Sequence, residues 1–562
     1  MTDRFKNLIP PELDLPSKYL EWRPEQSESV DDIVGSGKQF YLLDAPTGSG
    51  KTVTAVASYK RISVKDVVLD RLTGQEQLYR CIYLTKTKQL QEQILRDFPA
   101  VMVKGRRNYP CNARPNDFPD FNCEDCPGDA SKKSNQGEVF RPLMDKAALA
   151  CYGCQYKRAK GLAVKSPLVA LNDAYFLSEV NGPGMFSGAN MIVLDEIDSL
   201  EGGLMDFVKF TVSERQCLKY NLTTPNHLDS IQEWLGWANI ARAKVSQVAS
   251  RNAAQISMDL AHWTPLDMKL NKDVKAAGSF VHQMDMFIND VNDSWIVDIE
   301  NTTKRGGWMV TFKPVTVANY AEKYLWRHGK RFLGMSGTIL DPRIVAYDLG
   351  IPDFGYRNLT STFPVENRLI KYRPAANLVY GQMPVELPKL AKEVASLIKK
   401  HDGVNILIHA VSWDIRRYLM EILPTLGINP AVLMTHETEN RADQLELFKK
   451  SRGMIMISPS FDRGVDLPGD ECRVVIICKM PYMSIKDKQV KARMALQFGQ
   501  AWYNLKTIQT VMQMTGRAVR SPEDYALTYI LDRQFDSLLA RTRHLIPKWW
   551  LEAIRREAVG PL

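Results

Sequence analysis

The chain has 562 residues, of which 45% are hydrophobic and 24% charged, a composition that is ordinary for a soluble globular protein. At about 150 residues per domain this length predicts three to four domains, and the net charge of +9 permits an anionic partner. No apolar run reaches the ~18 residues that a membrane span requires, and residues 1–6 lack the apolar core of a signal peptide. These features exclude a membrane-spanning class and predict a cytoplasmic protein.

A short adenine-reading motif precedes the first strand. Gln26 lies about twenty residues before a glycine-rich stretch, and its carboxamide can pair with N7 and the N6 amine of adenine. The next apolar run, residues 40–43, predicts a strand.

A glycine-rich turn follows that strand and leads into a helix-competent run at residues 53–57. Strand, glycine-rich turn and helix in this order are typical of a phosphate-binding P-loop. The backbone of the turn would cradle the phosphates, Lys51 would reach the outer ones, and the Thr52 hydroxyl would hold Mg²⁺. The residues predicted to bind the nucleotide here are Ala45, Pro46, Thr47, Gly48, Ser49, Gly50, Lys51 and Thr52.

Residues 81–85 predict a second strand, and residues 87–98 predict a helix because Leu90, Ile94 and Phe98 recur at helical spacing. Thr85 at the join of strand and helix is a candidate contact for the backbone of a nucleic acid.

Five of the nine cysteines fall in a loop-rich segment with few apolar residues, and in a cytoplasmic chain such a cluster favours metal binding over disulfides. Thiolate ligation of an iron–sulfur cluster or of Zn²⁺ would constrain a segment that has too little core, and the spacing does not separate the two. The cysteines are Cys111, Cys123, Cys126, Cys151 and Cys154.

The apolar strand predicted at residues 191–194 ends in Asp195 and Glu196. Carboxylates at the end of a buried strand, downstream of a P-loop, indicate that Asp195 holds Mg²⁺ and that Glu196 activates the attacking water. Residues 200–325 are predicted to form an inserted, mostly helical domain, with a long helical run at 228–248. Residues 295–300 and 308–312 resemble the strands of a hairpin.

A second α/β series, with strands predicted at residues 404–409, 454–458, 473–478 and 526–531, has no second P-loop. It carries Gln513, Arg517 and Arg520 late in the chain instead. The two arginines are three residues apart and share one face of a helix. Such guanidinium groups can reach the γ-phosphate of a nucleotide held by another domain.

The order of these motifs resembles a superfamily 2 iron–sulfur DNA helicase of the XPD/DinG type, over residues 23 to about 531. The resemblance implies an α/β fold with two RecA-like parallel-sheet motor domains, the first carrying an iron–sulfur insert and a mostly helical arch insert. It divides the chain into the first motor domain (1–104, 161–200 and 326–348), the iron–sulfur insert (105–160), the arch (201–325) and the second motor domain (349–562).

The resemblance also implies site residues and cofactors. Cys111, Cys123, Cys126 and Cys154 match the ligands of a 4Fe–4S cluster, with Cys151 as an alternate, so Zn²⁺ is disfavoured. Asp466 belongs to a Gly-Val-Asp motif at the nucleotide site. The candidate DNA contacts are Thr85, Arg106, Tyr109 and Asn172.

The expected function is ATP-dependent unwinding of forked duplex DNA by a monomer, in a bacterial or phage setting, and the resemblance implies 5′→3′ movement on single-stranded DNA. One alternative is a strand-stimulated ATPase that remodels nucleoprotein or R-loops without processive unwinding. A scaffold with an inactive P-loop is a further alternative, which the intact Lys51, Glu196 and Arg520 disfavour.

Overall fold

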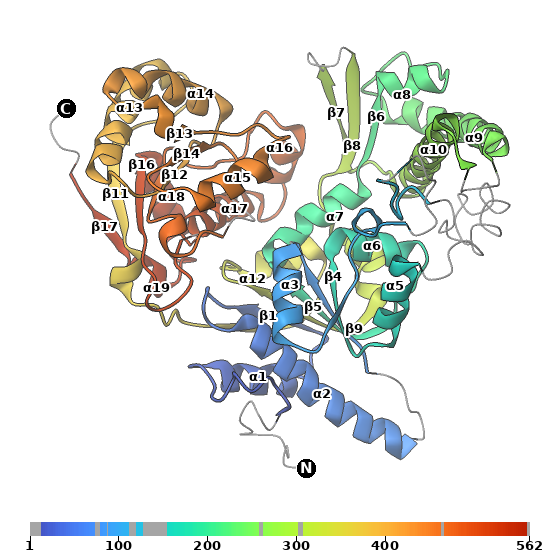
Figure 1. Ribbon diagram of the computed structural model, residues 1–562, viewed down its shortest axis with the longest axis horizontal. Coiled ribbons are helices and arrows are strands. Elements are labelled where there is room, and N and C mark those ends of the chain that lie inside the picture. Colours follow the sequence, from blue (N-terminus) through green and yellow to red (C-terminus); the bar gives the residue numbers. More distant parts are fainter. Residues whose placement is uncertain are drawn as a thin grey trace.

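The computed structural model describes residues 13–73, 79–86, 88–111, 118, 120–126, 154–257, 262–301, 307–461, 466–516 and 518–558. Within these residues the chain forms two parallel β-sheets and one antiparallel sheet, each accompanied by helices (Figure 1). The predicted α/β fold with two parallel-sheet domains and a mostly helical insert is confirmed.

The first sheet has the strand order β10-β1-β9-β5-β2-β4-β3, and all of its pairs are parallel. Helices cover both faces, so β1 and β2 are buried along their whole length. Neighbouring residues of β1 point to opposite faces, with Leu42 in one hydrophobic cluster and Leu43 in another. The strands are β1 (Phe40–Asp44), β2 (Cys81–Thr85), β3 (Val101–Met102), β4 (Leu168–Asn172), β5 (Ala189–Asp195), β9 (Gly329–Ser336) and β10 (Phe354–Asn358).

Helices from the first part of the chain pack on one face of this sheet and later ones on the other. One cluster includes residues of α1 (Gln26–Gly35), α2 (Lys51–Thr73) and α3 (Lys88–Asp97). The opposite cluster includes residues of α5 (Gln155–Lys165), α6 (Asp173–Asn181), α7 (Leu200–Val208), α11 (Ala318–Tyr324) and α12 (Pro342–Leu349).

Strands β1, β9 and β5 are neighbours, and their carboxyl ends lie together. Asp44 is in register with Ser336, and Asp195 with Met335. Because the loops that follow parallel strands gather at one edge, the P-loop, Glu196 and the segment after Ser336 meet there.

The boundary predicted between residues 348 and 349 differs from the sheet pairing. Strand β10 lies beyond that boundary, yet it pairs with β1 in the first sheet, from Phe40 opposite Phe354 to Asp44 opposite Asn358. The short sequence Phe354–Asn358 carries little apolar signal because it forms the sheet edge, where its burial is only partial.

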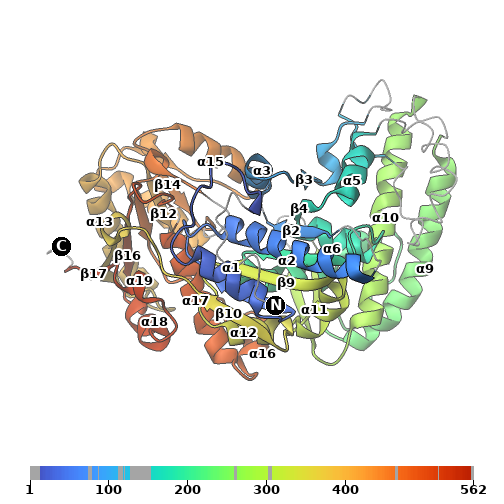
Figure 2. The same ribbon diagram turned by 90° about the horizontal axis from the view of Figure 1, so that it is seen from below.

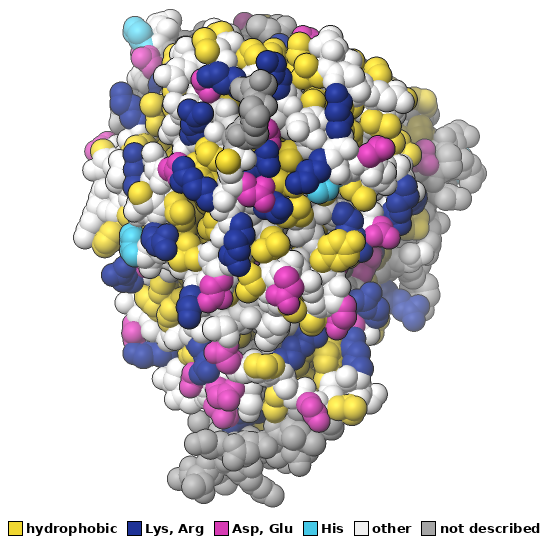
Figure 3. Space-filling view, turned by 90° about the vertical axis from the view of Figure 1, so that its left-hand side faces the viewer, with side chains coloured by type: hydrophobic (Ala, Val, Ile, Leu, Met, Phe, Trp, Pro, Cys, Tyr) yellow, Lys and Arg dark blue, Asp and Glu magenta, His cyan; other side chains and the backbone are white. Residues whose placement is uncertain are grey.

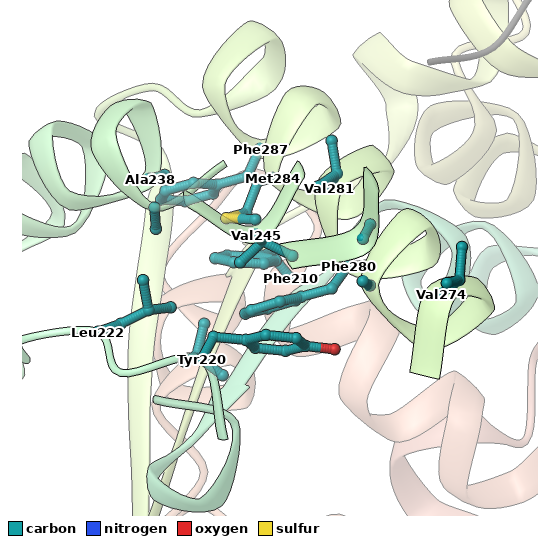
Figure 4. Close-up of a cluster of buried hydrophobic side chains, with 14 of the residues drawn as sticks. Phe210, Tyr220, Leu222, Ala238, Val245, Val274, Phe280, Val281, Met284 and Phe287 are labelled. Carbon is teal, nitrogen blue, oxygen red and sulfur yellow. The ribbon is translucent and has the colours of Figure 1, made fainter. Parts of the chain in front are cut away.

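The insert between β5 and β9 contains two long helices, α9 (Ile231–Gln255) and α10 (Pro265–Asp290), and a sheet of order β6-β8-β7. Its strands β6 (Phe210–Ser213), β7 (Trp295–Asn301) and β8 (Trp308–Pro314) are antiparallel, which confirms the predicted pairing of residues 295–300 with 308–312. Phe210, Phe280 and Phe287 stack in its core, where Tyr220 also packs (Figure 4). The arch was predicted at residues 201–325; from here on the name refers to residues 209–317, because α7 and α11 at its two ends pack against the first sheet. The helix α8 (Glu214–Lys219) completes it.

The second sheet has the order β13-β14-β12-β15-β16-β11-β17, again with parallel pairs throughout. Its strands are β11 (Ile370–Ala376), β12 (Ile406–His409), β13 (Leu433–Met434), β14 (Ile455–Ser458), β15 (Val474–Ile477), β16 (Leu527–Asp532) and β17 (Ile554–Arg556). Its helices are α13 (Met383–Lys400), α14 (Trp413–Ile422), α15 (Arg441–Lys450), α16 (Lys488–Met494), α17 (Gly499–Thr515), α18 (Gln534–Thr542) and α19 (Lys548–Leu551).

The second domain lies beside the first, and the helices α9 and α10 lie on the side of the molecule away from it (Figure 2). Helix α16 reaches the arch, where the Lys488 amine donates to the Val297 carbonyl at 2.9 Å and Lys313 pairs with Asp487 at 3.3 Å. On the face of the second domain shown in Figure 3, basic side chains are interspersed with acidic and hydrophobic ones. No described helix is both long and apolar enough to span a bilayer.

Candidate active site

The P-loop joins β1 to α2 at the carboxyl edge of the first sheet. Gly48 and Gly50 adopt φ angles of +85° and +80°, a region that residues with a side chain rarely adopt. The Lys51 amine donates to the Ala45 carbonyl at 3.1 Å, across the loop. The loop therefore has the geometry that the sequence predicts, with its lysine held on the inner side of the turn.

Gln26, at the start of α1, contacts the P-loop directly. Its amide nitrogen donates to the carbonyls of Ser49 and Gly50 at 3.0 and 3.2 Å, and its side-chain oxygen accepts from the Arg23 backbone at 2.8 Å. The structure thus brings the predicted adenine-reading residue against the phosphate-binding turn.

Asp195 lies at the end of β5, opposite the start of α2. Tyr83 links the two, because its hydroxyl lies 3.3 Å from Asp195 Oδ2 and 3.5 Å from the Thr52 hydroxyl. Burial, together with the charge of Glu196, raises the pKa of Asp195 to about 7. Its other oxygen, Oδ1, is buried without a hydrogen-bond partner among the described residues. An uncompensated carboxylate oxygen near a hydroxyl fits a site for a divalent cation, whose charge would favour the ionised form.

Glu196 follows directly in a left-handed conformation, with φ of +59°. This uncommon geometry for a residue with a side chain turns the chain sharply after β5. The Ser336 hydroxyl donates to its Oε2 at 3.3 Å. Glu196 therefore lies at the carboxyl edge of the sheet. A general base needs such a place, because its carboxylate must reach the attacking water.

Asp198, two residues after Glu196, is buried and connects the two domains. Its carboxylate accepts from Ser336 at 2.7 Å, from Thr338 at 3.3 Å and from the Gln513 amide of α17 at 2.8 Å. The Gln509 amide, one helical turn earlier, donates to the Thr338 carbonyl at 2.7 Å. The sequence held one sign of these contacts: Gln509 and Gln513 are four residues apart and therefore share one face of their helix.

Arg520 reaches the P-loop from the second domain. Its guanidinium lies 3.4 Å from the Thr47 hydroxyl and also forms an ion pair with Asp466. Arg517, the other predicted arginine, lies outside the described residues, and Arg520 is not on a helix as predicted, because α17 ends at Thr515. Arg520 and Gln513 thus place the second domain at the edge of the first sheet that carries Lys51 and Asp195.

A buried ion network that the sequence did not indicate lies between the two domains. Arg493 of α16 pairs with Asp348 of α12 at 2.5 Å and with Glu201 of α7, while Lys506 of α17 pairs with Glu201 at 3.2 Å. Burial lowers the pKa of Arg493 and raises that of Asp348. Their mutual contact opposes both shifts, because each charge stabilises the ionised form of the other. The network holds α16 and α17 against the first domain.

Four of the five clustered cysteines are described, and Cys151 lies outside the described residues. Cys111, Cys123 and Cys126 are buried, and the Sγ atoms of Cys123 and Cys154 are 3.5 Å apart. In the part of the chain that the structure describes, no three Cys, His, Asp or Glu side chains form a ligand set. The Cys123 and Cys154 sulfurs are therefore close enough to bind one metal ion or cluster together.

The candidate DNA contacts form two pairs. Thr85 and Asn172 are opposite each other in β2 and β4; the Thr85 side chain is fully buried, and Asn172 caps α6 by accepting from the Ala174 amide at 3.0 Å. Arg106 and Tyr109 both lie near the Tyr156 ring, at 5.8 and 5.5 Å from its centroid.

Comparison with known proteins finds similar helicases. A family model described as "Helicase C-terminal domain" matches residues 394–553, and one described as "Type III restriction enzyme, res subunit" matches residues 19–139. The ATP-dependent DNA helicase YoaA of Haemophilus influenzae is 22% identical, with 88% of each chain covered. The ATP-dependent DNA helicase DinG of Photobacterium profundum is 22% identical over 42% of this chain and 36% of that one.

A solved structure of XPD helicase is also similar, with a TM-score of 0.61 at 15% identity over 96% of this chain and 100% of that one. The chain is therefore similar to ATP-dependent DNA helicases of the XPD/DinG type over nearly its whole length. The likeness to XPD covers nearly the whole fold, while sequence similarity to YoaA extends over both parallel-sheet domains. In this XPD/DinG-type chain, residues of both domains converge on one P-loop.

Proposed function

We propose that this chain is an ATP-dependent DNA helicase that moves 5′→3′ on single-stranded DNA and unwinds duplex DNA. The observation that supports this most directly is that the second domain contacts the P-loop, through Arg520 beside Thr47. A site divided between two domains allows hydrolysis to change their relative position, which is what a motor requires. The family relationship supports DNA as the substrate.

The residues divide the chemistry among them. Lys51 would bind the outer phosphates, and Asp195 with the Thr52 hydroxyl would hold Mg²⁺, which neutralises charge on the phosphates when it is bound. Glu196 would orient the attacking water and accept its proton. Arg520 would stabilise the negative charge that develops on the transferred phosphoryl group.

Asp198 would carry the state of this site to the second domain. It joins Ser336 and Thr338 of the first domain to Gln513 of the second, so a shift of the β5 loop would move α17. Repeated opening and closing would move the strand stepwise, gripped by backbone contacts that do not read sequence. Thr85, Arg106, Tyr109 and Asn172 are the proposed contacts in the first domain.

A 4Fe–4S cluster held by Cys111, Cys123, Cys126 and Cys154 is also part of the proposal. Its support is the family relationship and the short distance between the Cys123 and Cys154 sulfurs. No step of the proposed ATP hydrolysis depends on the cluster.

The test is ATP hydrolysis with and without single-stranded DNA, together with strand displacement from duplexes carrying a 5′ or a 3′ overhang. We expect hydrolysis to be stimulated by DNA and displacement to require the 5′ overhang. Lys51→Ala should abolish both activities. Lys548→Ala, an exposed lysine on α19, is the matched control and should retain them.

Different failures have different meanings. Stimulated hydrolysis without displacement on either substrate would favour remodelling of nucleoprotein over unwinding. Displacement from the 3′ overhang alone would refute the proposed direction. Hydrolysis that persists in Lys51→Ala would refute the assignment of the P-loop.

A further inference from the structure

The loop that carries Arg520 leaves the end of α17 and leads into β16, and the side chain of Asp524 lies near its end. Oδ2 of Asp524 accepts from the Arg520 amide at 3.3 Å and from the Gly469 amide at 3.1 Å. The two amides belong to different loops, because Gly469 begins the short helix η10 (Gly469–Glu471), which follows Asp466. One carboxylate oxygen therefore joins the loop of Arg520 to the loop of Asp466.

The second oxygen of Asp524 is held by an arginine at the edge of the second sheet. Oδ1 accepts from the Arg473 guanidinium at 2.8 Å and from the Tyr525 amide at 3.0 Å. Arg473 immediately precedes β15, and its carbonyl accepts from the Leu527 amide of β16 at 3.0 Å. The Asp524 side chain is only 10% exposed, so water replaces these contacts poorly. The carboxylate is thus anchored on the sheet rather than on the loops that it joins.

The two loops joined by Asp524 carry an ion pair that faces the P-loop. The Arg520 guanidinium pairs with Asp466 and lies 3.4 Å from the Thr47 hydroxyl. An arginine side chain has several rotatable bonds, so its direction depends on where its backbone stands and on which partner holds its tip. Asp524 fixes the backbone of Arg520 directly and fixes the loop of Asp466 through Gly469.

We propose that Asp524 is a positioning residue for Arg520 and that, through Arg520, it sets the rate of ATP hydrolysis. The inference rests on the proposed function, in which Arg520 stabilises the charge that develops on the transferred phosphoryl group. Such stabilisation requires the donor to be in place before the reaction, and a misplacement of about 1 Å can lower the rate about 100-fold. A carboxylate is suited to this task because its hydrogen bonds to backbone amides and to a guanidinium are charge-assisted.

The test is Asp524→Asn, which keeps the size of the side chain. A carboxamide has one acceptor oxygen, so its NH₂ group would face either Arg473 or the two loop amides, and one set of contacts is lost. We expect kcat for DNA-stimulated ATP hydrolysis to fall by about 100-fold, with a smaller change in the KM for ATP. Asp470→Asn is the matched control: the exposed Asp470 pairs with the same Arg473 at 2.8 Å, and its replacement should leave kcat unchanged.

A double variant shows whether Asp524 acts through Arg520. If it does, Asp524→Asn should lower kcat in the unaltered protein but not further in Arg520→Ala, because the group that it positions is already absent. Lys51→Ala supplies the background rate for these measurements. An equal fold loss of kcat with and without Arg520 would overturn the inference, since Asp524 would then only support the fold. An unchanged kcat in Asp524→Asn would also overturn it. If the unaltered protein hydrolyses no ATP, it is the proposed function that fails.

Discussion

Removing Arg493 should destabilise the contact between the two domains more than removing any surface cation. The side chain is 2% exposed and contacts Asp348 and Glu201, both from the first domain. In Arg493→Met the methionine replaces the apolar part of the side chain, but Asp348 loses its ion-pair partner among the described residues. Deleting one member of a buried pair costs about 3–5 kcal/mol because the other charge stays in a poorly solvated site.

The loss of stability in Arg493→Met can be measured as a decrease of Tm in thermal unfolding. For a domain of roughly 200 residues, a loss of this size lowers Tm by on the order of 10 °C. Lys548→Met is the matched control, since Lys548 pairs with Glu552 at 3.6 Å while 91% exposed. A surface pair of this kind contributes about 0–1 kcal/mol, so its Tm should change little.

A second variant separates lost charge compensation from lost packing. Adding Asp348→Leu to Arg493→Met removes the unpaired carboxylate, and Glu201 still has Lys506 at 3.2 Å. We expect the double variant to recover part of the lost Tm. The reasoning is refuted if Arg493→Met shifts Tm no more than Lys548→Met, or if the double variant is less stable than the single one.

Three further predictions concern other parts of the molecule. Arg520→Ala should lower kcat for ATP hydrolysis by about 10³-fold or more, while nucleotide affinity changes less. Arg541, which is exposed on α18, provides the control variant Arg541→Ala. An equal loss of kcat in the two variants would contradict a role of Arg520 beside the phosphates. Burial and the neighbouring Arg327 lower the pKa of His328 from 6.5 to about 4, so the unfolded chain takes up a proton first as the pH falls. The contribution of neutral His328 to the free energy of unfolding is therefore fully present above pH 6.5 and is lost towards pH 4, by up to about 3 kcal/mol. The Tm of His328→Gln should fall less over this pH range than the Tm of the unaltered protein. Parallel plots of Tm against pH for the two proteins would refute the lowered pKa of His328. Finally, protein purified without air should contain iron and absorb visible light, Cys123→Ser should lose both, and Cys217→Ser, a buried cysteine of the arch, should keep them. Colourless protein containing zinc would contradict the cluster.

Local patterns predicted most of the framework. The apolar runs at residues 81–85 and 191–194 became β2 and β5, because continuous burial between two layers of helices requires continuous apolar sequence. The helix predicted at residues 87–98 became α3, since its apolar residues recur at helical spacing. Short edge strands such as β10 and β13 were missed, because partly exposed strands have no distinct apolar pattern.

The nucleotide site was predicted only in part. Lys51, Asp195 and Glu196 were predicted from motifs, because the chemistry expected of each is encoded by a few neighbouring residues. The hydrogen bond from Gln513 to Asp198 was not, since it joins residues more than 300 positions apart. The hydrogen bond from the Gly469 amide to Asp524 was missed for the same reason, since the two residues are 55 positions apart.

The sequence by itself determined which groups are available: a phosphate-binding turn, a pair of carboxylates, late arginines and clustered thiols. Only the tertiary structure decided which of them meet. The two parallel-sheet domains lie beside each other. This arrangement brings Arg520 close to Thr47 and buries Arg493 between Asp348 and Glu201 of the first domain. Such contacts depend on the relative position of separately folded layers, which neither hydrophobic periodicity nor local motif spacing encodes.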